Sequence, residues 1–111
     1  MDLTLTTRAI GDRTVLDVAG EVDVYSAPTL RDRIAELLEA SPAALLVNLC
    51  EVTFLDSTGI GILVASLNRA VQLGGSLSLV CDHERILKLF RITGLDAVFT
   101  IQPTVEDAIS S

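Results

Sequence analysis

The sequence predicts a single α/β domain, in which an N-terminal β-hairpin leads into a mixed, mostly parallel sheet packed with about four helices. Three observations favour this fold class. Two runs rich in Thr, Val and Leu flank a Gly-Asp pair near the N-terminus, which is typical of a hairpin. Short apolar runs then alternate with segments of helical periodicity, as they do in parallel α/β units. The length of 111 residues suits one domain over residues 1–111.

The hairpin comes first along the chain. Its strands are expected over residues 3–10 and 13–19, on either side of Gly11-Asp12. The stretch GEVDVY, residues 20–25, follows the second strand and is expected to be a loop or a short extended segment.

The stretch SAPTLRDRIAELLEA predicts the first helix. Ser26 is a favourable N-cap, and Pro28 lies in the first turn, where its missing N–H is harmless. Leucine and isoleucine side chains recur at helical spacing and define one apolar face, formed by Leu30, Ile34, Leu37 and Leu38.

The rest of the chain alternates between strands and helices. Strands are expected over 43–50, 76–81 and 97–102, and helices over 57–75, 82–94 and 104–111. Asp82 is the expected N-cap of the helix over 82–94 and Gly94 its C-cap. The expected buried face of the helix over 57–75 consists of Ile60, Leu63, Val64, Leu67 and Val71.

Composition excludes several classes of partner. Eight basic and 15 acidic residues give a net charge of -7, which argues against nucleic acid and against an anionic membrane surface. A basic protein partner would be attracted to this charge, but composition alone favours the simpler interpretation that the acidity only keeps a small protein in solution. No signal peptide or membrane-spanning run is present, so a cytoplasmic location is expected.

The two cysteines, Cys50 and Cys81, end apolar runs and are expected to be buried free thiols.

Nothing in the sequence predicts catalysis. The single histidine, His83, lies between Asp82 and Glu84 at the start of a helix, which is typical of a solvated first turn. No pattern links His83 to a serine nucleophile, and the cysteines lack metal-ligand spacing. A phosphate-binding loop with its lysine is absent. We therefore expect no enzyme activity, no metal and no cofactor.

The stretch LDSTGIG carries more specific information. Asp56 or Ser57 is expected to cap the helix that begins there, and Thr58 continues it. Gly59 and Gly61 each cost about 1 kcal/mol relative to alanine inside a helix. They would leave the approach to the helix N-terminus open, and such an end binds phosphate well. The phosphate could be covalently attached to Ser57.

Two further features could belong to the same site. Glu21 and Asp23 follow the second strand and Asp56 follows the third, so these acids could meet at one edge of the sheet. They could equally be ordinary loop acids. Ile62 is expected to be exposed one turn from Ser57, where it would suit a contact surface.

These motifs resemble a known family. GEVDVYSAPTLRDRI, LLVNLCEVTFLDSTGIGIL and ITGLDAVF, in this order, are similar to a STAS domain, and more narrowly to a bacterial anti-sigma factor antagonist. The resemblance covers nearly the whole chain. It implies that Ser57 is a phosphorylated serine and that Asp56, Thr58 and Gly59 flank it. It also places the family's loop acid at Asp23, and with Ile62 these residues form the expected partner-binding set.

The resemblance also implies a mechanism. Unphosphorylated members bind an anti-sigma factor, which is itself a GHKL-type serine kinase, and thereby free the sigma factor. Phosphorylation of the serine ends binding, and a PPM-type phosphatase resets the switch. Such a protein is a binding module without catalysis of its own. The alternative is a STAS subunit of a membrane lipid-transport complex, in which Ser57 is only a structural helix cap.

Overall fold

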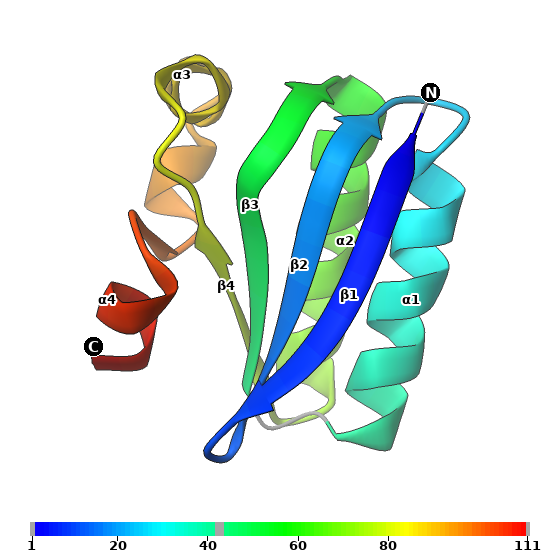
Figure 1. The fold of residues 1–111 in the computed structure, drawn as a ribbon, viewed down its shortest axis with the longest axis vertical. Coiled ribbons are helices and arrows are strands. Elements are labelled where there is room, and N and C mark those ends of the chain that lie inside the picture. The colour runs from blue at the N-terminus through cyan, green and yellow to red at the C-terminus, as the bar shows by residue number, and fades with distance from the viewer. Residues whose placement is uncertain (1, 42–43, 111) are drawn as a thin grey trace.

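The computed structural model describes residues 2–41 and 44–110, and shows one five-stranded sheet with helices on both faces (Figure 1). Positions 1, 43 and 111, which were assigned to the domain, the third strand and the last helix, lie outside the described residues. The elements are β1 (Leu3–Ile10), β2 (Arg13–Val22), α1 (Ala27–Ala40), β3 (Ala44–Leu55), α2 (Ser57–Gln72), β4 (Ser76–Val80), α3 (Glu84–Ile92), the 3-10 helix η1 (Leu95–Ala97), β5 (Ile101–Gln102) and α4 (Val105–Ser110).

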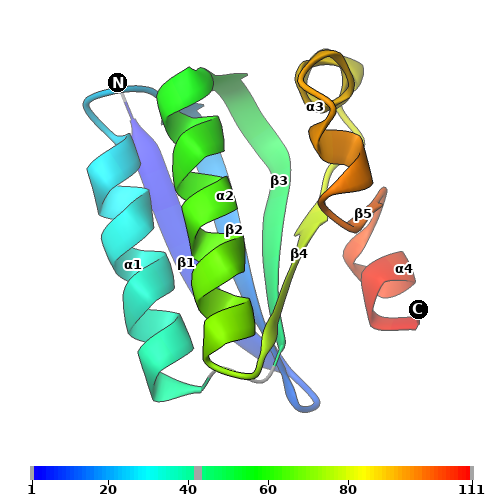
Figure 2. The same ribbon diagram turned by 180° about the vertical axis from the view of Figure 1, so that it is seen from behind.

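The sheet has the strand order β1-β2-β3-β4-β5. Strands β1 and β2 form the antiparallel hairpin, and every later neighbour pair is parallel. Helices α1 and α2 lie side by side over one face (Figure 2). On the opposite face, Ala108 of α4 packs with Val15, Leu46 and Val80. The predicted fold class is confirmed.

Helix α1 buries the face that its sequence predicts. Leu30, Ile34 and Leu38 are fully or almost fully buried against the sheet, and each such side chain contributes about 1.5–3 kcal/mol on leaving water. Ser26 is the N-cap residue, but its side chain does not cap the helix. Its hydroxyl donates to the carbonyl oxygen of Glu21 at 2.7 Å instead.

Helix α2 buries Leu63 as expected, and the expected Ile60, Val64 and Leu67 are half-buried against the core, but Val71 is not buried. The buried positions are Gly59, Leu63, Ser66 and Ala70, whereas Val71 is 64% exposed. Ile62 is also not exposed as expected, because it is half-buried and packs against the core. The reason is that small residues at the contact allow α2 to approach the sheet and α1 closely, which hydrophobic periodicity does not detect.

Several segments have other boundaries than expected, and α2, for example, ends at Gln72 and not at residue 75. Strand β2 continues through Gly20 to Val22, and β3 continues to Leu55, so both are longer than predicted. Helix α3 has His83 and not Asp82 at its N-cap, and Thr93 and not Gly94 at its C-cap.

The expected strand over 97–102 is wrong over most of its length. Its first residue ends η1, and only Ile101 and Gln102 are extended. The chain bends here to bury Phe99, whose ring meets that of Phe90 edge-on at 5.7 Å between centroids. Burying that ring outweighs the β-propensity of the segment.

Both cysteines are free thiols, as predicted, but only Cys81 is fully buried and Cys50 is half-buried. Within the described ranges, no helix is both long and apolar enough to cross a bilayer.

Candidate functional site

The predicted meeting of two loops at one sheet edge is confirmed. Strands β2 and β3 run parallel, with Val22 paired to Leu55 at their carboxyl ends. The backbone N–H of Asp56 donates to the carbonyl oxygen of Val22 at 3.3 Å. The turn after β2 and the start of α2 therefore lie side by side at this end of the molecule (Figure 1).

Asp56 is the residue that caps α2. Its backbone is extended, with φ -105° and ψ -176°, and its carboxylate accepts a hydrogen bond from the N–H of Gly59 at 3.1 Å. Ser57 is the first residue of the helix. Of the two residues expected to cap the helix, Asp56 does so and Ser57 does not.

Ser57 and Thr58 are both exposed in the first turn of α2. The backbone N–H groups at a helix N-terminus carry partial positive charge. A negatively charged group on either hydroxyl would therefore be favourably placed with respect to the helix.

Gly59 lets bulky side chains approach the first turn of α2 closely, which is one reason for glycine at this position. A Cβ at this position would lie 2.5 Å from Leu55 Cδ1 and 2.7 Å from Val22 Cγ1. Only glycine lets the first turn of α2 sit directly on the ends of β2 and β3. The expected role of keeping the approach clear fits Gly61 alone, which is exposed and would place a Cβ with no heavy atom within 4 Å.

Asp23 is 8% exposed and organises the turn that follows β2. Its Oδ1 accepts hydrogen bonds from the N–H groups of Tyr25 and Ser26, both at 2.9 Å. The Asp23 N–H in turn donates to the Ser26 hydroxyl at 3.0 Å. These N–H donors, Ser26 foremost and then Tyr25, hold the pKa of the Asp23 carboxyl below its usual range despite its burial. Asp23 is thus a nearly buried carboxylate that bonds the backbone of its own turn, and not the solvated loop acid that was one of the two expectations.

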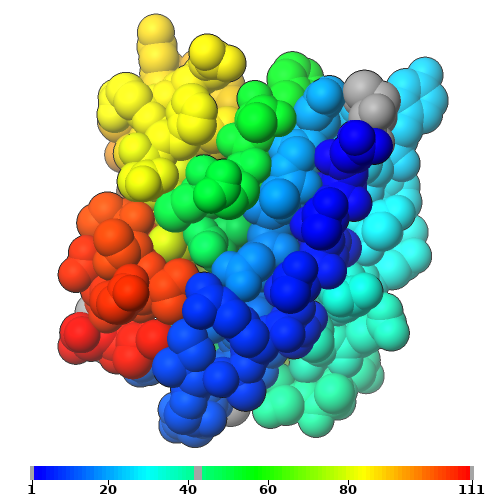
Figure 3. All heavy atoms as spheres, in the orientation of Figure 1, coloured from blue at the N-terminus to red at the C-terminus, as the bar shows by residue number. Residues whose placement is uncertain are grey.

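Three exposed apolar side chains beside this turn were not predicted. Tyr25 is 86% exposed, Val24 56% and Phe54 47%. The segment between β2 and α1 stands out at the upper right of the space-filling view (Figure 3). The signal in the sequence was the apolar pair Val24-Tyr25 inside an otherwise acidic loop.

A model of the STAS domain family matches residues 4–108. The chain belongs to the STAS domain family. It is similar to the "Anti-sigma-B factor antagonist" of Bacillus subtilis (strain 168), with 40% identity over 94 residues, or 85% of each chain. It is 33% identical over 106 residues to the protein of that name from Staphylococcus epidermidis, covering 96% of this chain and 98% of the relative.

Solved structures agree with this STAS domain. The crystal structure of an anti-sigma factor antagonist from Mycobacterium paratuberculosis matches with a TM-score of 0.91 and 31% identity, over 98% of this chain and 92% of that one. The unphosphorylated form of the anti-sigma factor antagonist SpoIIAA matches with a TM-score of 0.80 and 20% identity, over 96% and 93%, which supports the fold alone. The resemblance found in the sequence is confirmed.

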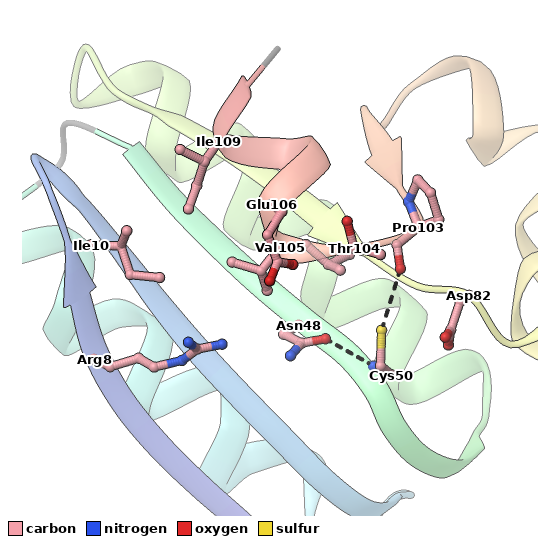
Figure 4. Close-up of a pocket in the computed structure, with 11 residues that line it drawn as sticks. Arg8, Ile10, Asn48, Cys50, Asp82, Pro103, Thr104, Val105, Glu106 and Ile109 are labelled. Carbon is pink, nitrogen blue, oxygen red and sulfur yellow. Dashed lines mark hydrogen bonds between the residues drawn. The ribbon is translucent and has the colours of Figure 1, made fainter.

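The STAS domain also has a pocket of about 390 Å³ on the face that α1 and α2 leave open. Arg8 and Ile10 of β1 face Val105 and Ile109 of α4 across it (Figure 4). Other lining residues include Asn48, Cys50, Val80, Asp82, Pro103, Thr104 and Glu106.

Polar groups at the pocket floor pair with one another. Arg8 Nε lies 2.7 Å from Asp17 Oδ2, and the Asn48 amide donates to Asp17 Oδ1 at 2.8 Å. Burial raises the pKa of the Cys50 thiol to about 11. No group of three or more potential metal ligands occurs in the part of the chain that the structure describes.

Proposed function

We propose that this STAS domain is an anti-sigma factor antagonist that acts in the cytoplasm. In its unphosphorylated form it binds an anti-sigma factor and thereby releases the sigma factor that the anti-sigma factor held. The proposal is supported by relatives named anti-sigma-B factor antagonist that are 40% and 33% identical over most of both chains. In this function the domain works by binding and catalyses nothing itself.

Ser57 is the proposed switch residue. The observation that carries this assignment is that Ser57 is exposed at the start of α2 while Asp56 provides the helix cap. The serine hydroxyl can therefore be modified without removing the hydrogen bond by which Asp56 caps the N-terminus of α2. A phosphate there adds about −1.5 to −2 charge at neutral pH, and the helix N-terminus tolerates that charge.

The proposed kinase is the anti-sigma factor itself, of the GHKL type. It transfers the γ-phosphoryl group of ATP to Ser57. A bond forms between Ser57 Oγ and the γ-phosphorus, the bond from that phosphorus to the departing ADP oxygen breaks, and the hydroxyl proton leaves to a base on the kinase. A PPM-type phosphatase reverses the state by hydrolysis, with water supplying the oxygen of the released inorganic phosphate.

Phosphorylation ends binding through desolvation and charge repulsion. A tightly packed interface cannot bury a doubly charged phosphate unless a cation faces it. The acidic side chains of Asp23 and Asp56 at the same edge add to the unfavourable field. A loss of about 3 kcal/mol would weaken binding roughly a hundredfold, which is sufficient for a switch.

The expected partner-binding residues contribute in different ways. Thr58 is exposed next to Ser57 and suits direct contact. Gly59 and Ile62 are suited to supporting that surface from within, because Gly59 is buried and Ile62 packs against the core. The alternative, a lipid-transport subunit, gave Ser57 only a capping role, and Asp56 fills that role in place of Ser57.

A phosphorylation assay tests the proposal. The purified domain is incubated with ATP and the anti-sigma factor of the same organism, and the modified residue is located by mass spectrometry. We expect phosphate on Ser57, none in Ser57→Ala, and normal incorporation in the control Ser41→Ala, which removes an exposed serine at the C-terminal end of α1. Binding of the anti-sigma factor should be lost on phosphorylation. Phosphate entering Ser57→Ala at the wild-type rate would contradict the assignment of Ser57.

A further inference from the structure

Three apolar side chains are exposed at the same end of the domain as Ser57. Tyr25, Val24 and Phe54 have exposed fractions of 86%, 56% and 47%. Single exposed apolar residues are common, but a group of three that includes two aromatic rings is typical of a contact surface. We call these three residues the apolar tip.

The register of the sheet brings the apolar tip next to the switch. Phe54 is paired with Glu21 at the end of β2 and β3, two residues before Asp56. Val24 and Tyr25 follow Val22, whose carbonyl oxygen accepts the hydrogen bond from the Asp56 N–H. The apolar tip and Ser57 therefore lie at the same end of the domain, on neighbouring segments of the chain.

The turn that carries Val24 and Tyr25 is held by Asp23. Its buried carboxylate accepts from the backbone N–H groups of Tyr25 and Ser26, both at 2.9 Å. A turn fixed in this way presents its side chains with little loss of conformational entropy on binding. Asp23 faces its own turn, so any effect it has on a partner passes through the position of Tyr25.

We propose that the apolar tip is the anchor by which this domain docks onto its anti-sigma factor, and that Asp23 is the positioning residue that holds Val24 and Tyr25 for it. This inference rests on the proposed function and adds the surface that makes the contact. Tyr25 would insert into an apolar recess of the partner, and phosphate on Ser57 would act at the edge of that contact.

The charge of the domain and the position of the apolar tip near Ser57 both favour the anti-sigma factor as the protein that covers the tip. A partner that responds to Ser57 must cover the surface around it, and the apolar tip lies at the same end of the domain. A second copy of this chain is disfavoured, because two molecules that each carry a net charge of -7 repel one another. The fitting partner has an apolar recess bordered by basic side chains, which complement carboxylates such as Glu21 and Asp56.

Binding measurements on matched variants test the anchor. Tyr25→Ala and Phe54→Ser should each weaken binding of the purified anti-sigma factor about tenfold or more, as truncating an interface anchor does. Val71→Ser is the control, because Val71 is 64% exposed but lies near the other end of α2. It should bind like the wild type. Equal affinities for Tyr25→Ala, Phe54→Ser and Val71→Ser would overturn the proposal.

The positioning role of Asp23 has its own test. Asp23→Ala removes the acceptor for both N–H groups, so it should weaken binding, whereas Asp23→Asn keeps an acceptor oxygen and should restore most of the affinity. Loss of affinity in both variants to the same degree would show that the charge of Asp23 contacts the partner directly, and would overturn the positioning role. Circular dichroism spectra of both variants should match the wild type.

Two further measurements distinguish a failure of the apolar-tip proposal from a failure of the proposed function. Ser57→Asp is measured beside the tip variants: if it weakens binding while Tyr25→Ala does not, the apolar tip fails and the proposed switch stands. If neither affects binding, the proposed function fails. Sedimentation of the domain alone should show a monomer, and a dimer that Tyr25→Ala dissociates would overturn the choice of occupant.

Discussion

The backbone N–H of Asp56 donates to the carbonyl oxygen of Val22, with 3.3 Å between the two atoms. This bond connects the turn after β2 to the N-terminus of α2. A change in the packing of either segment is therefore expected to reach the other.

Ser57→Ala is expected to leave the free energy of unfolding within about 0.5 kcal/mol of the wild type, because an exposed residue without the capping role is being changed. Asp56→Ala should cost about 1 kcal/mol, because it removes the cap that bonds the Gly59 N–H. Urea unfolding of both variants checks this. A larger loss for Ser57→Ala than for Asp56→Ala would contradict the assignment of the cap.

Ser57→Asp is expected to weaken binding of the anti-sigma factor by about tenfold, since a single carboxylate carries less charge than phosphate. Its melting temperature should stay near that of the wild type, because negative charge suits a helix N-terminus. Calorimetric titration provides the affinity. Ser41→Asp, at the C-terminal end of α1, adds the same charge elsewhere and should bind normally.

Gly59→Ala and Gly61→Ala should have opposite effects. The first places a methyl group 2.5 Å from Leu55 Cδ1 and 2.7 Å from Val22 Cγ1, and such overpacking costs about 1–3 kcal/mol. The second meets no heavy atom within 4 Å and should gain up to about 1 kcal/mol from helix propensity. Thermal unfolding of the pair checks this, and a stable Gly59→Ala would mean that α2 can move away from the sheet freely.

The domain is expected to lose folding stability in acid when Asp23 is protonated. The N–H donors of Ser26 and Tyr25 hold its folded pKa below the ordinary value of 3.8, despite burial. A depressed carboxyl pKa stabilises the fold above about pH 4, and that stability disappears as the pH falls through the folded pKa.

Asp23→Asn cannot titrate, so its unfolding free energy should decline less than that of the wild type below about pH 4. Asp12→Asn, in the exposed hairpin turn, is the matched control and should keep the wild-type slope. Urea unfolding across this pH range provides the comparison. Identical slopes for all three proteins would exclude a stabilising role for the Asp23 charge.

Cys50 should react slowly with alkylating reagents at neutral pH. Burial raises the pKa of its thiol to about 11, and only the thiolate is a strong nucleophile. The alkylation rate of the native protein should therefore keep rising with pH up to about 11. Cys50→Ser should remove this reaction, because Cys81 is only 2% exposed. Fast alkylation of the wild type at neutral pH would contradict the raised pKa.

Local patterns determined the fold class and the position of the site. Alternating apolar runs and helical periods are encoded within short windows, so the hairpin, the helix from Ser26 and the strand before Asp56 follow from sequence alone. The two acidic loops were expected to meet because parallel strands end at the same edge. The motifs GEVD and LDSTG, in this order along the chain, also identified the family. Both can be recognised in the sequence because they form a local turn and a local helix cap.

Tertiary packing decided the details that periodicity cannot contain. Whether Asp56 or Ser57 caps α2 depends on which oxygen reaches the Gly59 N–H in the folded chain. Val71 is exposed and Ile62 is half-buried, and both depend on how α2 lies against the sheet and α1. The exposure of Tyr25 depends on Asp23 turning inward to bond its own loop. The sequence by itself thus determined where the site lies, and packing between elements distant in sequence decided which side chains it presents.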